Sequence, residues 1–143
     1  MDWIADRKRR EDLIRSRAET VWKDFRIALA RDLESFKTHY SFAGTATPND
    51  FSPTEYRFNL VRGTDRFAPQ EAVSFTFQDD AIIVAGLTGP RRRFPLAIRG
   101  SHDVVFEHAV ADERLLLTPE ELSRTLLEPF LFAKQKGRLP IIG

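Results

Sequence analysis

The sequence predicts an α+β protein with a long N-terminal helix, an antiparallel meander sheet of roughly six strands and a C-terminal helix kinked near Pro129. Over the first 40 residues, apolar side chains recur every three or four positions, the period of an amphipathic helix. Between residues 54 and 117 the period is two, as in half-buried strands. A helical pattern returns over residues 118–136. These three patterns define the fold class.

The composition is that of one ordinary globular domain. The chain has 143 residues, of which 42% are hydrophobic and 30% are charged, and its formal net charge is +1. A chain of this length buries about two thirds of its unfolded surface. We therefore expect a single domain over residues 1–143, with the long helix in 1–43, the sheet in 54–117 and the C-terminal helix in 118–136. The small net charge gives no reason to expect a nucleic-acid or membrane partner.

The N-terminal helix is longer than the domain it belongs to. No glycine or proline interrupts it, and its apolar stripe includes Ile14, Val21, Phe25 and Leu29. If residues 6–40 are all helical, the helix is about 50 Å long, whereas a compact domain of this size is about 30 Å across. Either the helix breaks, or one end projects and the stripe meets a second copy or another protein at an interface.

The stretch 73–86 predicts a hairpin, around which the sheet is organised. Its apolar residues alternate with polar ones, and Asp79 and Asp80 form the turn. This turn places Phe77 opposite Ile82. One face of the hairpin is then aromatic and aliphatic, so we expect helices to cover it.

Four further strands are predicted from alternating patterns, and their short connections indicate an antiparallel meander. Residues 44–53 have the composition of a loop. The proline at position 95 favours a sheet edge or a bulge. A turn at residues 112 and 113 would set Leu115 opposite Val110 and Leu117 opposite His108. The four strands are centred on Phe58, Leu96, Phe106 and Leu115.

The C-terminal helix has strong boundary signals. Thr118 is the expected N-cap, Pro119 the first helical residue and Glu121 the partner of Thr118 in a capping box. Pro129 lacks the amide hydrogen that a helix interior needs, so a kink is expected there. Gly137 is the expected stop signal.

Aromatic residues on the apolar sheet face are candidates for lining a ligand cavity. A curved meander closed by a helix can hold a small apolar ligand. The alternative is that these rings simply fill the core, because protein interiors are close-packed. For the histidine among them, a hydrogen-bonded role at the core edge is the alternative to ligand contact. The candidates are Tyr56, Phe58, Phe75, Phe77, Phe106 and His108.

An arginine cluster is a candidate anion site. Arg91, Arg92 and Arg93 follow a Gly-Pro turn, and Arg99 lies across the next turn. Guanidinium groups bind phosphate and carboxylate groups through paired hydrogen bonds. The alternative is a solvated loop that protects a sheet edge. Because no aromatic residues interleave with the cluster, nucleic-acid binding is not favoured.

Motifs for chemistry are absent from the sequence. There is no cysteine, no paired-histidine spacing, no phosphate-binding loop and no nucleophile motif, so no metal and no cofactor are predicted. The first 30 residues lack the apolar run of a signal peptide, and no stretch is long and apolar enough for a membrane helix, which favours a cytoplasmic protein.

Three hypotheses for function follow from these residues. The first is a non-catalytic assembly module, homo-oligomeric through the long helix or bound to a protein partner. The second is binding of a small apolar ligand between sheet and helices, and the third is binding of an anion or nucleic acid through residues 91–93. The sequence supplies no positive reason to propose an enzyme, and it leaves that class undecided.

Overall fold

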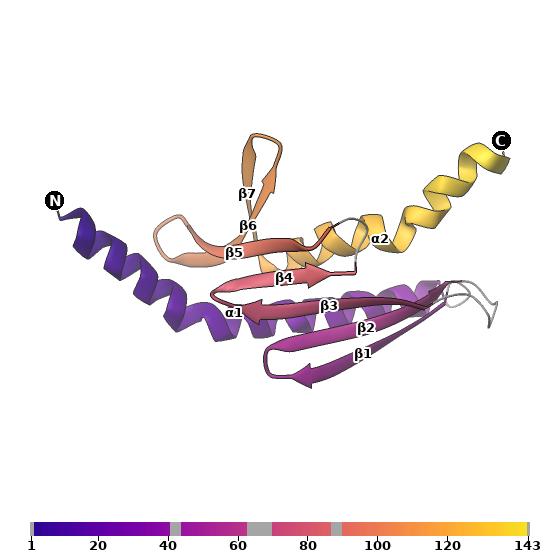
Figure 1. The fold of residues 1–143 in the computed structure, drawn as a ribbon, viewed down its shortest axis with the longest axis horizontal. Coiled ribbons are helices and arrows are strands. Elements are labelled where there is room, and N and C mark those ends of the chain that lie inside the picture. Colours follow the sequence, from indigo (N-terminus) through magenta and orange to yellow (C-terminus); the bar gives the residue numbers. More distant parts are fainter. Residues whose placement is uncertain (1, 41–43, 63–69, 87–89, 143) are drawn as a thin grey trace.

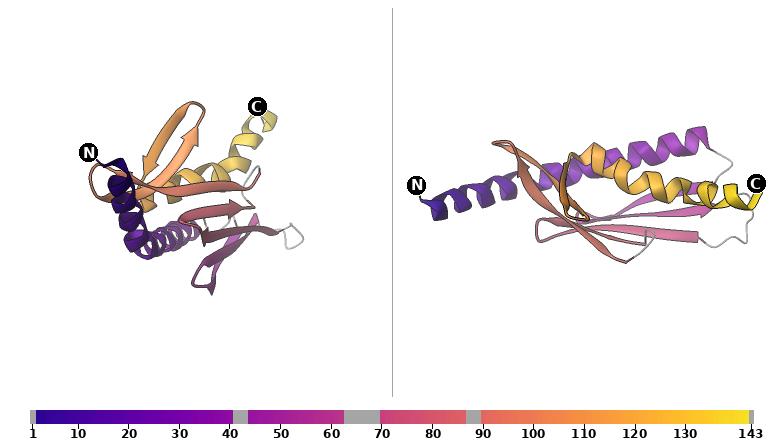
Figure 2. Two further views of the ribbon diagram at one scale, coloured as in Figure 1. Left: turned by 60° about the vertical axis from the view of Figure 1, so that its left-hand side comes forward. Right: turned by 90° about the horizontal axis from the view of Figure 1, so that it is seen from above.

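Two helices cover one face of a single antiparallel sheet (Figures 1 and 2). The computed structural model describes the backbone of residues 2–40, 44–62, 70–86 and 90–142. It describes the side chains of the same ranges except those of residues 44–52, 59–62, 70, 71 and 133–142. The predicted α+β class, with a long first helix, a meander sheet and a C-terminal helix, is confirmed.

The first helix, α1, is one unbroken element from Trp3 to His39. Asp2 caps it, since its side chain accepts hydrogen bonds from the amides of Ile4 and Ala5. The 37 residues span about 55 Å at 1.5 Å per residue. The sequence predicted either a break in this helix or a projecting end. The N-terminal end projects beyond the body of the domain (Figure 1).

Seven strands follow in the spatial order β1 to β7, so every strand pairs with its neighbours in sequence. All six pairings are antiparallel, as the short connections predicted. The strands are β1 Gly44–Ser52, β2 Glu55–Arg62, β3 Gln70–Gln78, β4 Ala81–Ala85, β5 Arg92–Arg99, β6 Asp103–Val110 and β7 Glu113–Leu117.

The β3–β4 hairpin has the predicted register. Phe77 pairs with Ile82 across the turn formed by Asp79 and Asp80. Both aspartates have positive φ, 54° and 55°, the conformation of a tight hairpin turn that matches strand twist. Aspartate tolerates this left-handed region better than most residues, which explains why the turn forms at this pair.

The register of the last hairpin differs from the predicted one by two residues. Leu115 pairs with His108, and Val110 pairs with Glu113. The turn is centred one residue earlier than predicted, and Ala111 adopts a positive φ of 55° within it. An alanine gives no sequence signal for this conformation. The alternating pattern therefore predicted which face each side chain occupies, but not which residues of the two strands lie opposite each other.

Two other predictions about the sheet need correction. Residues 44–52 were expected to form a loop, but their backbone forms β1, the edge strand beside β2. Pro95 was expected at a sheet edge or bulge, whereas β5 lies inside the sheet. Pro95 ends the pairing of β5 with β4, and Leu96 begins the pairing with β6. Pro95, which has no amide hydrogen, therefore lies where β5 stops pairing with β4 and starts pairing with β6.

The second helix, α2, runs from Pro119 to Ile142. Its capping box forms as predicted, because Glu121 accepts from the Thr118 amide at 2.9 Å and Thr118 Oγ1 accepts from the Glu121 amide at 3.2 Å. The helix changes direction along its length (Figure 1). It continues past Gly137, which the sequence had suggested as its end.

The core lies between the helices and the inner face of the sheet. Phe25 of α1 is fully buried and meets Phe75 and Phe106 edge-on, with ring centroids 5.6 Å apart in both pairs. Such geometry is favourable because the positive edge of one ring faces the negative face of another. Trp22 stacks on Phe77 and donates its indole N–H to the Pro53 carbonyl at 2.8 Å. The middle of α1 is thereby fixed to β3, to β6 and to the turn between β1 and β2.

We expect Phe25→Ala to lower the free energy of unfolding by about 3–5 kcal/mol, because it removes a buried ring and leaves a cavity between α1 and the sheet. The measurement is urea denaturation followed by circular dichroism. Ile27→Ala is the matched control on the same helix, since Ile27 is 53% exposed and its change should stay within about 0.5 kcal/mol. Equal losses for the two variants would contradict this packing.

Candidate functional site

The first part of α1 is a helical arm that the rest of the chain does not cover. We call residues 3–17 the arm, because none of them is buried and Ala18 is the first buried residue of the helix. Trp3 is 70% exposed and Ile4 is 61% exposed, the two highest values among the large exposed hydrophobic residues. Leu13 and Ile14 are partly buried where the arm joins the core.

Local interactions keep the arm helical without tertiary packing. Arg7 pairs with Glu11 at 3.3 Å and Lys8 with Asp12 at 2.7 Å, one helical turn apart. Each exposed pair of this kind contributes only about 0.3–0.5 kcal/mol. The packed part of α1 contributes more, because a helix that is already nucleated extends without the nucleation cost. The arm is therefore a preformed surface.

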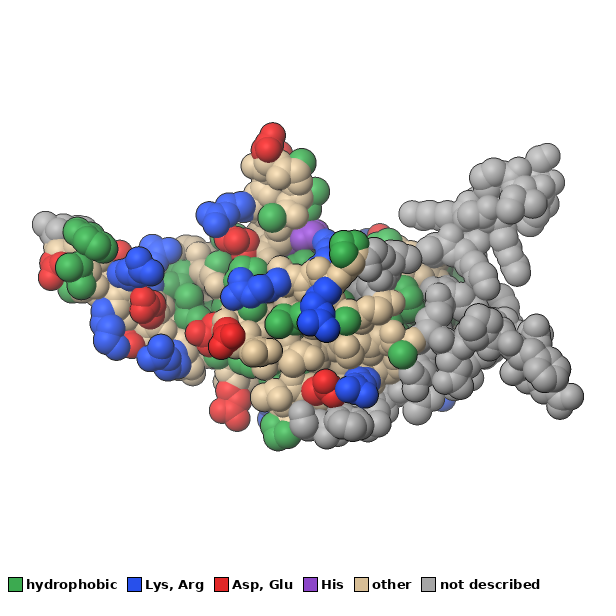
Figure 3. All heavy atoms as spheres, viewed as in Figure 1, with side chains coloured by type: hydrophobic (Ala, Val, Ile, Leu, Met, Phe, Trp, Pro, Cys, Tyr) green, Lys and Arg blue, Asp and Glu red, His purple; other side chains and the backbone are tan. Residues whose placement is uncertain are grey.

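The arm combines an apolar tip with a basic stem. Figure 3 shows hydrophobic side chains at its end and mainly basic ones along it. Residues 3–17 contain six basic and three acidic side chains. Trp3 and Ile4 are neighbours and together place two large apolar side chains in solvent at the end of the arm.

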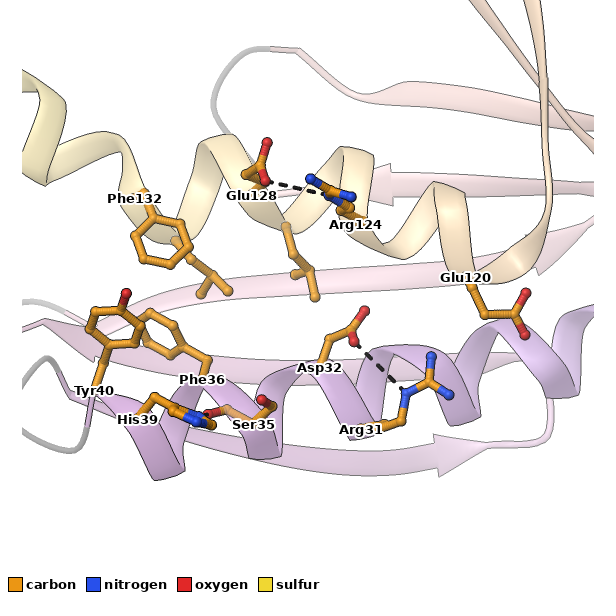
Figure 4. Close-up of a pocket in the computed structure, with 12 residues that line it drawn as sticks. Arg31, Asp32, Ser35, Phe36, His39, Tyr40, Glu120, Arg124, Glu128 and Phe132 are labelled. Atoms are coloured by element: carbon orange, nitrogen blue, oxygen red, sulfur yellow. Dashed lines mark hydrogen bonds and ion pairs between the residues drawn. The ribbon is translucent and has the colours of Figure 1, made fainter.

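A groove lies between α1 and α2 on the outer side of the helical layer (Figure 4). Its volume is about 490 Å³, within the range of known ligand and peptide sites. We call it the inter-helix groove. It is lined by Arg31, Asp32, Ser35, Phe36, His39 and Tyr40 of α1 and by Glu120, Arg124, Leu127, Glu128, Leu131 and Phe132 of α2.

One end of the inter-helix groove is aromatic. Phe36 stacks on Tyr40 with centroids 5.3 Å apart, and Phe132 meets both rings edge-on at 5.7 and 5.3 Å. Tyr40 and Phe132 are only partly buried, so ring surface remains accessible. In Figure 4 these three side chains gather at one end. This end can accept an apolar side chain.

The other end of the groove is charged. Asp32 accepts a hydrogen bond from the buried hydroxyl of Ser123 at 2.7 Å, which ties α1 to α2. Arg124 pairs with Glu128 at 3.5 Å. Glu120 makes no hydrogen bond or ion pair with any residue that the structure describes. The groove thus holds three carboxylates against two guanidinium groups.

A smaller hollow of about 280 Å³ shares the lining residue Glu120 with the groove. It is lined by Arg17, Thr20 and Asp24 of α1 together with Arg99 of β5 and Asp103 of β6. We call the groove and the hollow together the trough. On α1, the hollow lies within residues 17–24 and the groove within residues 31–40.

The six aromatic-face candidates lie in the core, away from the trough. Tyr56, Phe58, Phe75 and Phe106 are each 3% exposed or less, and Phe77 packs at their edge. Their rings contact one another and Phe25, in the manner of the core-filling alternative. The structure therefore separates these residues from the groove, which uses none of them.

His108, the sixth candidate, is 7% exposed and packs against Phe94, with ring centroids 5.3 Å apart. The Arg92 guanidinium lies 3.4 Å from both ring nitrogens and 5.1 Å from the Phe94 centroid. Burial first, and the charge of Arg92 second, lower the pKa of His108 below its ordinary value of 6.5. The neutral form of the ring is thereby favoured.

The four arginines of the predicted anion site point to different surroundings. Arg92 lies on the inner face of β5 beside His108, whereas Arg93, its neighbour in the strand, is exposed on the other face. Arg99 lies 3.8 Å from Glu121 at the start of α2. Arg91 is exposed before β5 begins. Anion binding by these residues stays a prediction.

The residues predicted for an interface lie mostly inside the chain. Val21, Phe25 and Leu29 are 8%, 0% and 0% exposed, and Ile14 is partly buried. The physical reason is that this part of the stripe covers the sheet of its own chain. Val21, Phe25 and Leu29 are therefore unavailable to a partner, whereas the tip of the arm and the outer side of α1 stay exposed.

Sequence reasoning did not find the trough, because it combines residues about 90 positions apart. One signal was present: Asp32 directly precedes the buried Leu33, and Ser123 directly follows the buried Leu122. Polar residues beside buried apolar ones on two helices suggest that they hydrogen-bond to each other.

Among the described residues, no three histidine, aspartate or glutamate side chains gather as they would around a metal ion. Over its described length, neither helix has the apolar stretch that crossing a membrane requires. No protein-family model, curated protein or solved structure matches the chain. The arm and the trough are therefore interpreted from their own geometry.

We expect the free energy of unfolding to fall as the pH is lowered from about 7.5 to about 5.5, because unfolded histidine takes up a proton before His108 does in the folded chain. His108→Gln should reduce this dependence, measured by urea denaturation at both pH values. Asp6 and Glu121 have lowered carboxyl pKa values and titrate below this window. His102→Gln, at an exposed turn, is the control. Unchanged dependence in His108→Gln would contradict the assignment.

Proposed function

We propose that the protein is a non-catalytic assembly module that forms a homo-oligomer through the arm of α1. The observation that carries the proposal is the exposed tip, where Trp3 and Ile4 extend from the domain on a preformed helix. Apolar surface held in this way gains free energy when a partner covers it.

The cost of association is low for such a helix. Ordering a flexible segment on binding costs about 2–5 kcal/mol or more. The arm is already ordered by its N-cap, by its ion pairs and by continuity with the packed part of α1. Binding energy from the tip is therefore available for affinity.

A second copy is the partner that we favour. Most soluble oligomers are symmetric and built from identical chains. A two-fold arrangement uses the arm twice, so each dimer buries two apolar tips. Stable interfaces bury about 1,200–2,000 Å² in total, and two helical contacts reach such an area more readily than one.

We expect the intact chain to have about twice its own mass in size-exclusion chromatography with light scattering, and Trp3→Glu with Ile4→Glu to reduce it to the monomer mass. Glutamate suits the first turn of a helix because it complements the helix dipole. The variant should therefore keep its helix content, measured by circular dichroism.

The control is Ile27→Glu, which places the same charge on an exposed apolar residue of α1 outside the arm. This variant should keep the mass of the unaltered chain. A monomeric unaltered chain at every concentration, or an unchanged mass after the double substitution, would sink the proposed function.

A further inference from the structure

We propose that the arm of one copy docks in the trough of a second copy, and that the second copy returns its own arm in the same way. This inference rests on the proposed function and specifies its binding site. The occupant is a second copy of this chain. Length, surface chemistry and charge each support it.

The arm is short enough to lie within the trough. The 15 residues of the arm extend about 22 Å. The α1 side of the trough, from Arg17 to Tyr40, extends about 34 Å. One arm can therefore lie along the trough without reaching past its ends.

A two-fold axis makes both contacts at once. Suppose that two α1 helices run antiparallel and cross near Thr20. The numbers of two facing residues, one from each helix, then add up to about 40. Trp3 then lies opposite Lys37, next to Phe36. Each arm covers residues 23–37 of its partner, which include Arg31, Asp32, Ser35 and Phe36 of the groove and end one turn before Tyr40. The assembly closes at two copies.

The apolar tip meets the aromatic end of the groove in this arrangement. Tyr40 and Phe132 keep accessible ring surface there, and Leu131 lies in the same wall. Indole rings pack well against the edges and faces of other aromatic rings, with a contribution of about 0.5–1.5 kcal/mol beyond area burial. Trp3 is the natural anchor residue for this end.

The basic stem meets carboxylates of the trough. The arm carries six basic and three acidic residues. The trough is lined by five carboxylates and four guanidinium groups, those of Asp24, Asp32, Asp103, Glu120 and Glu128 and of Arg17, Arg31, Arg99 and Arg124, so its charge is opposite in sign to that of the arm. The Glu120 side chain has no hydrogen-bond or ion-pair partner among the described residues, and it lines both the groove and the hollow. A guanidinium from the arm would give it one.

Cysteine cross-linking tests the site directly, because the chain contains no cysteine. A chain carrying both Ala5→Cys and Ser35→Cys keeps the Trp3 anchor and cannot close a disulfide on itself. The two positions are 30 residues apart on one continuous helix, which is about 45 Å, and a disulfide needs Cα atoms within about 7 Å. Any disulfide between these two positions joins two copies.

We expect this double variant to form covalent dimers under mild oxidation at least about tenfold faster than a control with Ala5→Cys and Asp112→Cys, because docking raises the local thiol concentration. Asp112 is exposed at the β6–β7 turn, outside the trough. Mixing chains that carry only Ala5→Cys with chains that carry only Ser35→Cys should give the mixed dimer.

Three results separate this inference from the proposed function. A dimer mass with cross-linking no faster than the control overturns docking in the trough while self-association stands. Fast dimerisation of Ala5→Cys alone means that the arms pair tip to tip, which also overturns it. A monomer mass overturns both proposals.

Charge reversal gives an independent readout. We expect Glu120→Lys to weaken dimerisation about two- to fivefold at low salt, as for one exposed ion pair, with a smaller effect at high salt. Glu113→Lys, on the exposed end of β7, is the matched control and should leave the dimerisation constant unchanged. Equal effects of both substitutions would exclude a specific role for Glu120.

Discussion

The contact between the α1 stripe and the inner face of the sheet determines where every other part of the molecule lies. Phe25 is fully buried at its centre and touches rings from β3 and β6, which are distant strands of the sheet. Among the described elements that precede α2, α1 is the one long enough to cross the seven strands. Because the sheet needs a cover on this face, the stripe from Val21 to Phe36 is committed to the core.

That commitment explains both candidate surfaces. The core uses mainly the later part of α1, so the first 15 residues of this unbroken 37-residue helix contain no buried residue, and only Leu13 and Ile14 among their large apolar side chains pack partly against the core. The same stripe holds α1 beside α2, and the part-buried hydrogen bond from Ser123 to Asp32 links the two helices. Two helices held side by side leave a groove between their outer faces (Figure 4). The arm and the trough are therefore two results of one packing arrangement.

Periodicity predicted those features of the fold that depend on which face a residue occupies. It placed Phe75 and Phe77 inside, and it fixed the β3–β4 register because two aspartates marked the turn. It missed β1 because Gly44–Ser52 does not alternate, and its strand comes from backbone pairing with β2. The arm followed from helix length alone. The trough could not be predicted, since side chains from two helices meet only after folding.

In the proposed assembly, folding depends on the core contact of α1 and association depends on its arm, so substitutions can change one without the other. Substitutions at the tip change no buried residue, so they should alter mass without altering the stability of one chain. Core substitutions such as Phe25→Ala should lower the stability of one chain before they change the mass of the assembly, because the arm keeps its own local helix stabilisation. If arms instead joined successive copies head to tail, the same exposed tip would build open chains rather than dimers. A reciprocal exchange avoids this outcome, because each docked arm uses up the trough that another copy would need.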